Sequence, residues 1–161
     1  MTRYLTLSEA LYINALVTRD KKLLRGDKDI RDMGLLESAL QRPSASAFGA
    51  DAFVTLAEKS AALLHAIARN HPFADGNKRT ATVGAVFMLC VNGQAVTWEP
   101  PQALEMILNV AEGRCDLYQL ASWFPLAPCP LRLEPDETHD AHTIQQIMTE
   151  QKWLLDALES R

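Results

Sequence analysis

Apolar residues in this chain recur every three or four positions, and almost no stretch alternates apolar and polar residues as a half-buried strand does. This spacing gathers apolar side chains on one face of a helix, so it predicts an all-α fold. Two helix starts carry a capping box, Thr followed three residues later by Glu: Thr6 with Glu9, and Thr55 with Glu58. The second start opens the strongest helical pattern, which ends before Pro72 because a residue preceding proline avoids the helical conformation.

The segment that follows is apolar almost all round in its second half. This pattern, over residues 77–91, predicts a buried central helix. Shorter helices are expected over residues 32–42, 100–111 and 116–124. Residues 44–51 are small and turn-forming, which predicts a loop or a short hairpin.

The composition changes after residue 124, where four of the eight prolines lie between Pro125 and Pro135. Proline at this density is typical of a connecting segment. Apolar residues then return at helical spacing. We therefore expect a compact helical domain over residues 1–126, a Pro-rich linker over 127–139 and an amphipathic C-terminal helix over 140–161.

The charge balance disfavours nucleic-acid binding, because 16 Lys and Arg against 20 Asp and Glu give a net charge of −4. The modest basic run from Lys21 to Arg31 is interpreted as a solvated face. No run of 18 apolar residues exists, and the first residues lack a signal-peptide pattern. Three widely spaced cysteines are typical of a reducing compartment. We expect a cytoplasmic protein without membrane or direct nucleic-acid contacts.

The segment HPFADGNKRTA, residues 71–81, joins the two strongest helices and is rich in chemically active groups. His71 ends the first helix, and an imidazole with an ordinary pKa near 6.5 is a usable base at neutral pH. Asp75 follows four residues later and offers the carboxylate oxygen that Mg²⁺ prefers. A base and a metal ligand are thus expected close together.

The start of the next helix adds an anion site. Gly76 lets the backbone approach a ligand closely. Free backbone N–H groups at a helix start attract anions, and Asn77, Lys78 and Arg79 begin this helix. Each of these residue types is also common where one helix ends and the next begins. Their combination in this order predicts phosphoryl or nucleotidyl transfer.

This loop resembles the HxFx(D/E)(G/A)N(G/K)R signature of Fic/Doc proteins at every specified position, and Lys78 with the following Thr80 and Ala81 resembles the Doc (death-on-curing) branch. The resemblance extends over about residues 1–125, and includes residues 4–9, 31–40, 56–64, 92–93 and 111–113. It implies a compact Fic-type helical bundle with a short flap, to which this chain adds a C-terminal helical extension.

The resemblance also implies a role for each residue of the loop. His71 would deprotonate a target hydroxyl, Asp75 would hold Mg²⁺, and Phe73 would anchor the loop in the core. The phosphates of ATP would be bound by Gly76, Asn77, Lys78 and Arg79.

Residues 44–51 lie where the family has a flap that docks the target polypeptide in extended form. Small residues suit that role, and they suit any surface loop equally well. The flap residues expected on this basis are Ser44, Ala45, Ser46, Ala47, Phe48 and Gly49.

The expected reaction type rests on two positions at which this chain differs from AMP-transferring Fic proteins. AMP-transferring Fic proteins usually carry a second Arg where this chain has Thr82, and a Gly where it has Lys78. The Doc resemblance implies instead a protein kinase that transfers the γ-phosphoryl of ATP to a Ser/Thr hydroxyl of a translation elongation factor, arresting growth until a cognate antitoxin binds. AMP transfer stays open as an alternative, as does a catalytically silent binding module that acts through the flap and tail helix.

The C-terminal tail has two interpretations. It folds back on its own domain or mediates a homodimer, or it inhibits the active site from within the chain. Inhibitory Fic helices carry Ser/Thr-xxx-Glu, and the tail has Thr143 but Ile147 in the Glu position. This mismatch counts against the inhibitory interpretation.

Overall fold

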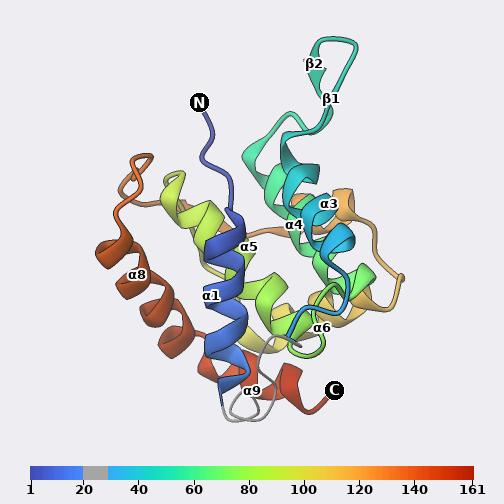
Figure 1. Cartoon of the computed structure of the whole chain (residues 1–161), viewed down its shortest axis with the longest axis vertical. Helices are drawn as coiled ribbons and strands as arrows, with labels where there is room; N and C mark the ends of the chain where they lie inside the picture. The colour runs from blue at the N-terminus through green and yellow to red at the C-terminus, as the bar shows by residue number, and fades with distance from the viewer. Residues whose placement is uncertain (20–28) are drawn as a thin grey trace.

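The computed structural model describes residues 1–19 and 29–161, and all structural statements below concern those residues. Lys21, Lys22, Arg25 and Lys28, from the basic run, therefore lie outside the described residues. The described part is a helical bundle with two small two-stranded sheets, which confirms the all-α expectation (Figure 1). The helices are α1 (Leu7–Val17), α3 (Met33–Gln41), α4 (Leu56–Asn70), α5 (Asn77–Val91), α6 (Pro100–Ala111), α7 (Leu117–Trp123), α8 (Glu137–Glu150) and α9 (Lys152–Glu159), with a 3₁₀ turn η2 (Arg42–Ser44).

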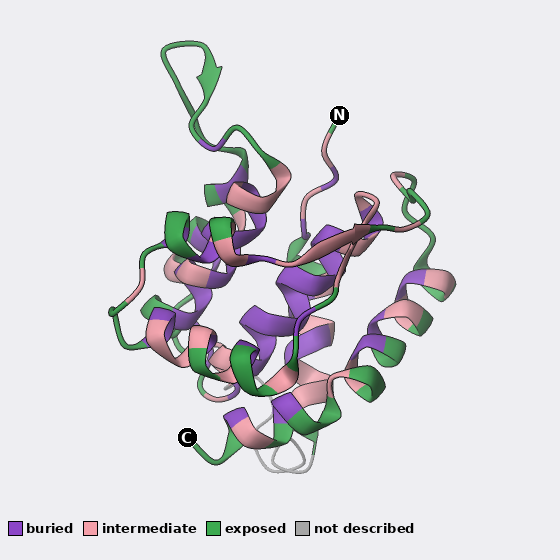
Figure 2. Ribbon diagram, turned by 180° about the vertical axis from the view of Figure 1, so that it is seen from behind, coloured by how far each residue is buried: buried purple, intermediate pink, exposed green. Residues whose placement is uncertain are grey.

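Helix α5 lies at the centre, as its apolar sequence predicts. It contacts α1, α4, α6, α8 and α9, and nearly every residue from Arg79 to Val91 is buried (Figure 2). The expected helix caps also form. The side chain of Thr6 accepts a hydrogen bond from Glu9 N at 3.2 Å, and that of Thr55 accepts one from Glu58 N at 3.0 Å. These caps start α1 and α4.

The short strands form two antiparallel pairs. The strands β1 (Ser46–Ala47) and β2 (Ala50–Asp51) make a hairpin that projects from the bundle (Figure 1). The strands β3 (Gln94–Val96) and β4 (Leu126–Pro128) pair in the register that sets Ala95 opposite Ala127. Strand β4 holds the start of the expected Pro-rich linker against the end of α5.

The C-terminal helix differs from the expectation in two ways. It begins at Glu137 rather than near residue 140, because the Asp136 side chain accepts a hydrogen bond from His139 N at 3.1 Å and caps the first turn. It also breaks at Gln151 into α8 and α9. The Gln151 side chain accepts a 2.9 Å hydrogen bond from the Trp98 indole, which ties the break to the bundle.

The tail is packed on the domain. Buried apolar side chains of α8 and α9 join the common core. Arg3 forms ion pairs with Asp140 at 2.6 Å and with Glu9 at 2.8 Å. Burial alone would raise the pKa of the Asp140 carboxyl, but the hydrogen bonds from Arg3 outweigh it and hold that pKa below its usual range. The core residues contributed by the tail are Ile144, Ile147, Leu154, Leu155 and Leu158.

No helix in the described ranges is long and apolar enough to cross a membrane.

Candidate active site

The loop between α4 and α5 begins with an unusual backbone. His71 is the C-cap of α4 and adopts the left-handed conformation, with φ 51° and ψ 57°. Few residues other than glycine take this conformation, and those that do cluster at functional sites. The turn ends α4 and leaves His71 exposed at the surface.

Arg31 braces this turn from a distant part of the chain. Its guanidinium donates to the backbone oxygen of His71 at 2.6 Å and to that of Asn70 at 2.8 Å. Its backbone N–H donates to Pro72 O at 2.8 Å, and Ile30 pairs with Phe73 as an isolated β-bridge. Arg31 is exposed, as a solvated face predicts, and its contacts with the loop backbone are an addition that the sequence did not predict.

Phe73 and Asn77 lock the middle of the loop. The Phe73 ring is buried, with 1% of its surface exposed. The Asn77 side chain accepts a hydrogen bond from Phe73 N and donates one to Phe73 O, each at 2.9 Å. Both polar atoms of the Asn77 side chain are thus hydrogen-bonded within the loop. If Asn77 contacts a phosphate, it does so through its backbone N–H.

Helix α1 supports the other side of the loop. Asn14, which is buried, donates to the backbone oxygen of Asp75 at 2.9 Å and to the Thr80 hydroxyl at 3.1 Å. Gly76 has φ 74°, and a Cβ atom there would lie 2.8 Å from the Thr18 methyl group. Only glycine fits this position without a shift of α1. Gly76 also brings no capping side chain, so the first N–H groups of α5 can donate to an anion.

Arg79 lies among negative groups. Its side chain is 8% exposed; one guanidinium nitrogen lies 3.7 Å from Asp75 Oδ2 and another 3.4 Å from Glu159 Oε1. The same guanidinium donates to the backbone oxygen of Val17. Lys78 reaches the backbone oxygen of Arg161 with its Nζ at 3.5 Å. The end of α9 therefore contacts Arg79, and Arg161, two residues beyond this helix, contacts Lys78.

These groups surround one hollow of about 180 Å³. His71 and residues 74–79 line the loop side. Leu158, Glu159 and Arg161 line the side formed by α9. The structure thus brings together His71, Asp75, Gly76, Asn77, Lys78 and Arg79.

The surroundings of His71 lower the pKa of its imidazole and so favour the neutral form. Partial burial lowers the pKa of His71, and the nearby charges of Lys78, Arg31 and Arg69 lower it further. A neutral imidazole can accept a proton at pH 7.

Asp75 offers a partial metal site. No group of three or more His, Cys, Asp or Glu residues in the described ranges could hold a metal ion by itself. Mg²⁺ commonly takes one or two carboxylates and fills its remaining positions with phosphate oxygens and water. The single carboxylate of Asp75, beside an anion site, fits that pattern.

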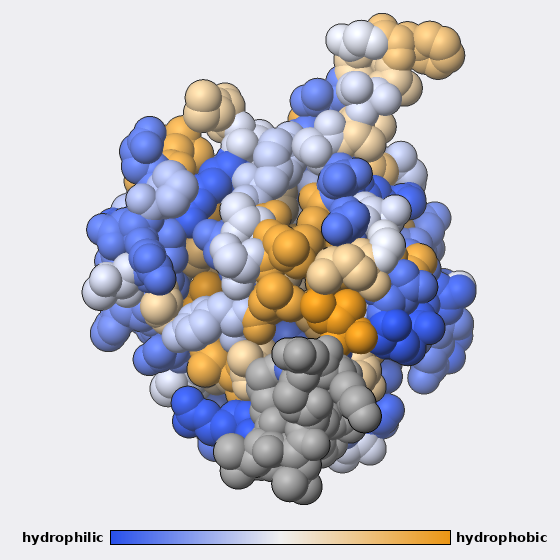
Figure 3. All heavy atoms as spheres, in the orientation of Figure 1, coloured by the Kyte–Doolittle hydropathy of each residue, from blue (hydrophilic) through white to orange (hydrophobic). Residues whose placement is uncertain are grey.

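The hairpin expected to act as a flap lies elsewhere. It precedes α4, whereas His71 follows α4, and a helix of 15 residues is about 22 Å long. The expected docking residues Ser44 to Gly49 are therefore not brought to the loop, and a target strand paired with this hairpin would lie far from His71. Phe48 at its tip is fully exposed, with φ 55°, and forms an apolar projection (Figure 3).

Asn14, Arg31 and Glu159 are the site residues that sequence reasoning missed. Each contacts the loop from 40 or more positions away. The sequence around them gives little indication of this role. Asn14 is a polar residue within an apolar stripe, and Arg31 ends a run of basic residues, and both patterns are common in proteins.

The sequence is similar to those of known proteins. The Fic/DOC family model matches residues 4–89. The toxin Doc of Mycolicibacterium smegmatis is 38% identical over 124 residues, which cover 76% of this chain and 91% of that protein. Both matches include the loop that carries His71 and the anion-binding start of α5, and on this basis the chain belongs to the Fic/DOC family.

Proposed function

We propose that this protein is a Doc-type toxin that transfers the γ-phosphoryl group of ATP to a Ser or Thr hydroxyl of a protein. One observation carries the proposal. The neutral imidazole of His71 shares a small hollow with Lys78, Arg79 and the first backbone N–H groups of α5. A base thus lies next to a site for phosphate oxygens, which is the arrangement that phosphoryl transfer needs.

The residues act in a defined order. Lys78, Arg79 and the N–H groups at the start of α5 bind phosphate oxygens and stabilise the charge that develops on them. His71 Nδ1 or Nε2 accepts the proton of the target hydroxyl as its oxygen attacks the γ-phosphorus. The bond from the γ-phosphorus to the bridging oxygen breaks, ADP leaves, and His71 later releases its proton to water. Mg²⁺, held by Asp75, would supply positive charge to the phosphates.

The environment of Thr82 favours phosphoryl transfer over AMP transfer. Thr82 is fully buried, and its hydroxyl donates to the backbone oxygen of Lys78 at 2.8 Å. Thr82 therefore cannot bind the distal phosphates as a second Arg at this position would. AMP transfer is the competing reaction, and the label experiment below separates the two.

The partners belong to the same proposal. A toxin related to Doc is expected to have a cognate antitoxin and a protein target, and a translation elongation factor is the target class that the resemblance implies. The relative's name supports the toxin assignment. A homodimer and a cytoplasmic location stay predictions.

The test is a transfer assay in cell lysate. The protein is incubated with Mg²⁺ and ATP labelled at either the γ- or the α-phosphorus, and His71→Ala is the control. Label on protein from γ-labelled ATP alone, lost in His71→Ala, is the expected result. Label from α-labelled ATP would establish AMP transfer instead. The assay is repeated with Glu159→Gln, in which the carboxylate that pairs with Arg79 is removed. Absence of any His71-dependent label in both proteins would favour a binding module.

A further inference from the structure

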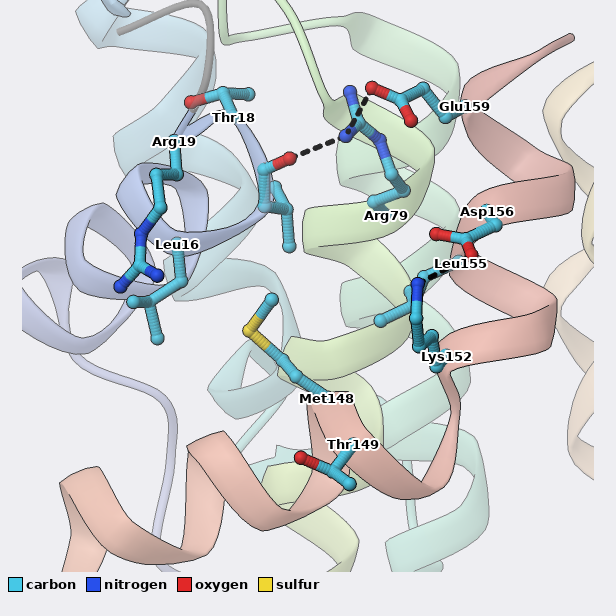
Figure 4. Close-up of a pocket in the computed structure, with 11 residues that line it drawn as sticks. Leu16, Thr18, Arg19, Arg79, Met148, Thr149, Lys152, Leu155, Asp156 and Glu159 are labelled. Atoms are coloured by element: carbon cyan, nitrogen blue, oxygen red, sulfur yellow. Dashed lines mark hydrogen bonds and ion pairs between the residues drawn. The ribbon is translucent and has the colours of Figure 1, made fainter. Parts of the chain in front are cut away.

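A second hollow opens on the other side of Arg79. It has a volume of about 450 Å³ and lies between the end of α1, the end of α8 and one face of α9 (Figure 4). Arg79 and Glu159 line both this hollow and the smaller one at the loop. The Arg79–Glu159 ion pair therefore forms the partition between the two spaces.

The two hollows differ in size and in chemistry. Pockets for small molecules usually measure about 300–1,000 Å³. The loop hollow, at about 180 Å³, is below that range and mostly polar in its lining, whereas the second, at about 450 Å³, is within it. The larger hollow has an apolar floor and a charged rim. Its apolar floor is formed by Leu16, Val17, Met148 and Leu155.

We infer that the second hollow holds the nucleoside of the nucleotide whose phosphates bind at the start of α5, so that the C-terminal extension completes the nucleotide site. This inference rests on the proposed function. A nucleoside has a flat apolar body with a hydrogen-bonding edge, which matches this lining. Figure 4 shows Met148 reaching toward the middle of the space, with Leu16 on one side and Lys152 on the other. A thioether packs favourably against an aromatic ring.

The polar rim has groups for the edge of a base and for the ribose. Lys152 and Asp156 form an ion pair at 2.8 Å, and the Thr149 hydroxyl, which donates to Gln145 O at 3.1 Å, can still accept a hydrogen bond from a ligand. These groups lie on the opposite side of the hollow from the end of α1 (Figure 4). Arg79 sits between the base end and the phosphate end, which is where a nucleotide has its α- and β-phosphates.

The partition is easily opened. Glu159 is the last residue of α9, its side chain is 48% exposed, and its contact with Arg79 is long at 3.4 Å. Turning Glu159 into solvent does not leave the buried Arg79 unpaired, because Asp75 is a second carboxylate partner of the same guanidinium. Arg79 stays fixed because Val17 O and Asp75 also contact it. A rotation of the Glu159 side chain would join the two hollows without moving Arg79.

The test measures the binding of ATP and of inorganic tripolyphosphate by calorimetry, with Mg²⁺, in the full chain carrying Glu159→Gln. Met148→Trp fills the second hollow. Gln146→Trp adds the same ring to an exposed position of α8 and is the matched control. We expect Met148→Trp to weaken ATP binding at least about tenfold and tripolyphosphate binding less than about twofold, with Gln146→Trp changing neither.

Unchanged ATP affinity in Met148→Trp, with both ligands lost in Arg79→Ala, would overturn the inference and leave the proposed function standing. Binding of neither ligand to any variant would overturn both. Photolabelling of the unsubstituted chain with 8-azido-ATP covers the case in which Met148→Trp disturbs the fold. Label in residues 16–19 or 148–156 supports the inference, and label only in other segments contradicts it.

Discussion

The β1–β2 hairpin and the α8–α9 tail are two additions to the same helical core, and they relate to it in opposite ways. All four strand residues of the hairpin are exposed, and its main tie to the bundle is the ion pair of Asp51 with Lys59 at 3.1 Å (Figure 2). The tail buries five apolar side chains in the common core and carries the buried Asp140.

Their positions relative to the loop are also opposite. The hairpin, expected from the sequence to dock a target, lies at the far end of α4 from His71. The tail, for which folding back on its own domain was one of the interpretations, does fold back and ends against Lys78 and Arg79. Small, turn-forming residues thus mark a surface loop without saying which end of the bundle it occupies.

The largest expected difference is in stability. Deleting residues 133–161 exposes the core surface that the tail covers, and burial of one large apolar side chain contributes about 1.5–3 kcal/mol. We expect this deletion to lower the free energy of unfolding by at least about 5 kcal/mol or to abolish cooperative unfolding. Replacing residues 46–50 by two glycines, which keeps Asp51 beside Lys59, is expected to cost less than about 1 kcal/mol. Thermal and urea unfolding followed by circular dichroism measure both, and equal losses would contradict the comparison.

A pair of single substitutions repeats this contrast. Asp140→Asn removes one of the two carboxylates paired with the buried Arg3 and leaves Glu9 in place, so the expected cost is up to about 3 kcal/mol, the lower end of the cost of breaking a buried pair. Asp51→Asn removes a carboxylate that is 61% exposed from the buried Lys59, which keeps its 2.7 Å hydrogen bond to Phe53 O, so the expected cost is smaller, about 1 kcal/mol. Urea unfolding at pH 7 measures the two values.

The ion pair of Asp140 with Arg3 also makes the free energy of unfolding depend on pH. The pKa of Asp140 is lowered in the folded protein, so its contribution to stability is present above the pKa of the unfolded chain and is lost as the pH falls through the folded value. Asp140→Asn should therefore flatten the acid limb of the stability curve, which urea unfolding between pH 3 and pH 7 measures.

Activity is the next contrast. Glu159→Gln removes the carboxylate that contacts Arg79, so phosphate has one competitor fewer, and we expect the transfer rate to rise about fivefold. Phe48→Ser at the hairpin tip should change the rate less than about twofold. Glu150→Gln, which alters an exposed carboxylate of α8 away from Arg79, is the control for charge. A faster Phe48→Ser variant and an unchanged Glu159→Gln variant would reverse the roles assigned here.

The smallest effect concerns His71. Its pKa lies below the ordinary value of about 6.5 because of burial and the charges of Lys78, Arg31 and Arg69. A histidine NMR titration should therefore place its midpoint below that value, and the transfer rate should rise with pH through the same midpoint. Lys78→Met should move the midpoint upward, since one of the lowering charges is gone. A midpoint above 6.5 would be incompatible with this electrostatic environment.

Much of the fold and the heart of the site could be predicted, because the signals are local. Thr6 and Thr55 cap helices through contacts three residues away. The groups of the loop are nearly consecutive, so their meeting in space follows from one turn. The rest depends on distant contacts: Arg31 binds the loop across 40 positions and Glu159 across 80. No periodicity or motif encodes such pairings, which arise only when the helices pack.

Amide hydrogen exchange, measured with and without Mg²⁺ and a non-hydrolysable ATP analogue, tests most directly whether the tail rather than the hairpin belongs to the active site. In the free protein, amides of α8 and α9 should be protected and those of residues 46–51 should exchange at once. Addition of the analogue should change exchange in the first turn of α5 and in residues 148–159, and leave the hairpin unaffected. A response in the hairpin with none in the tail would contradict the assignment.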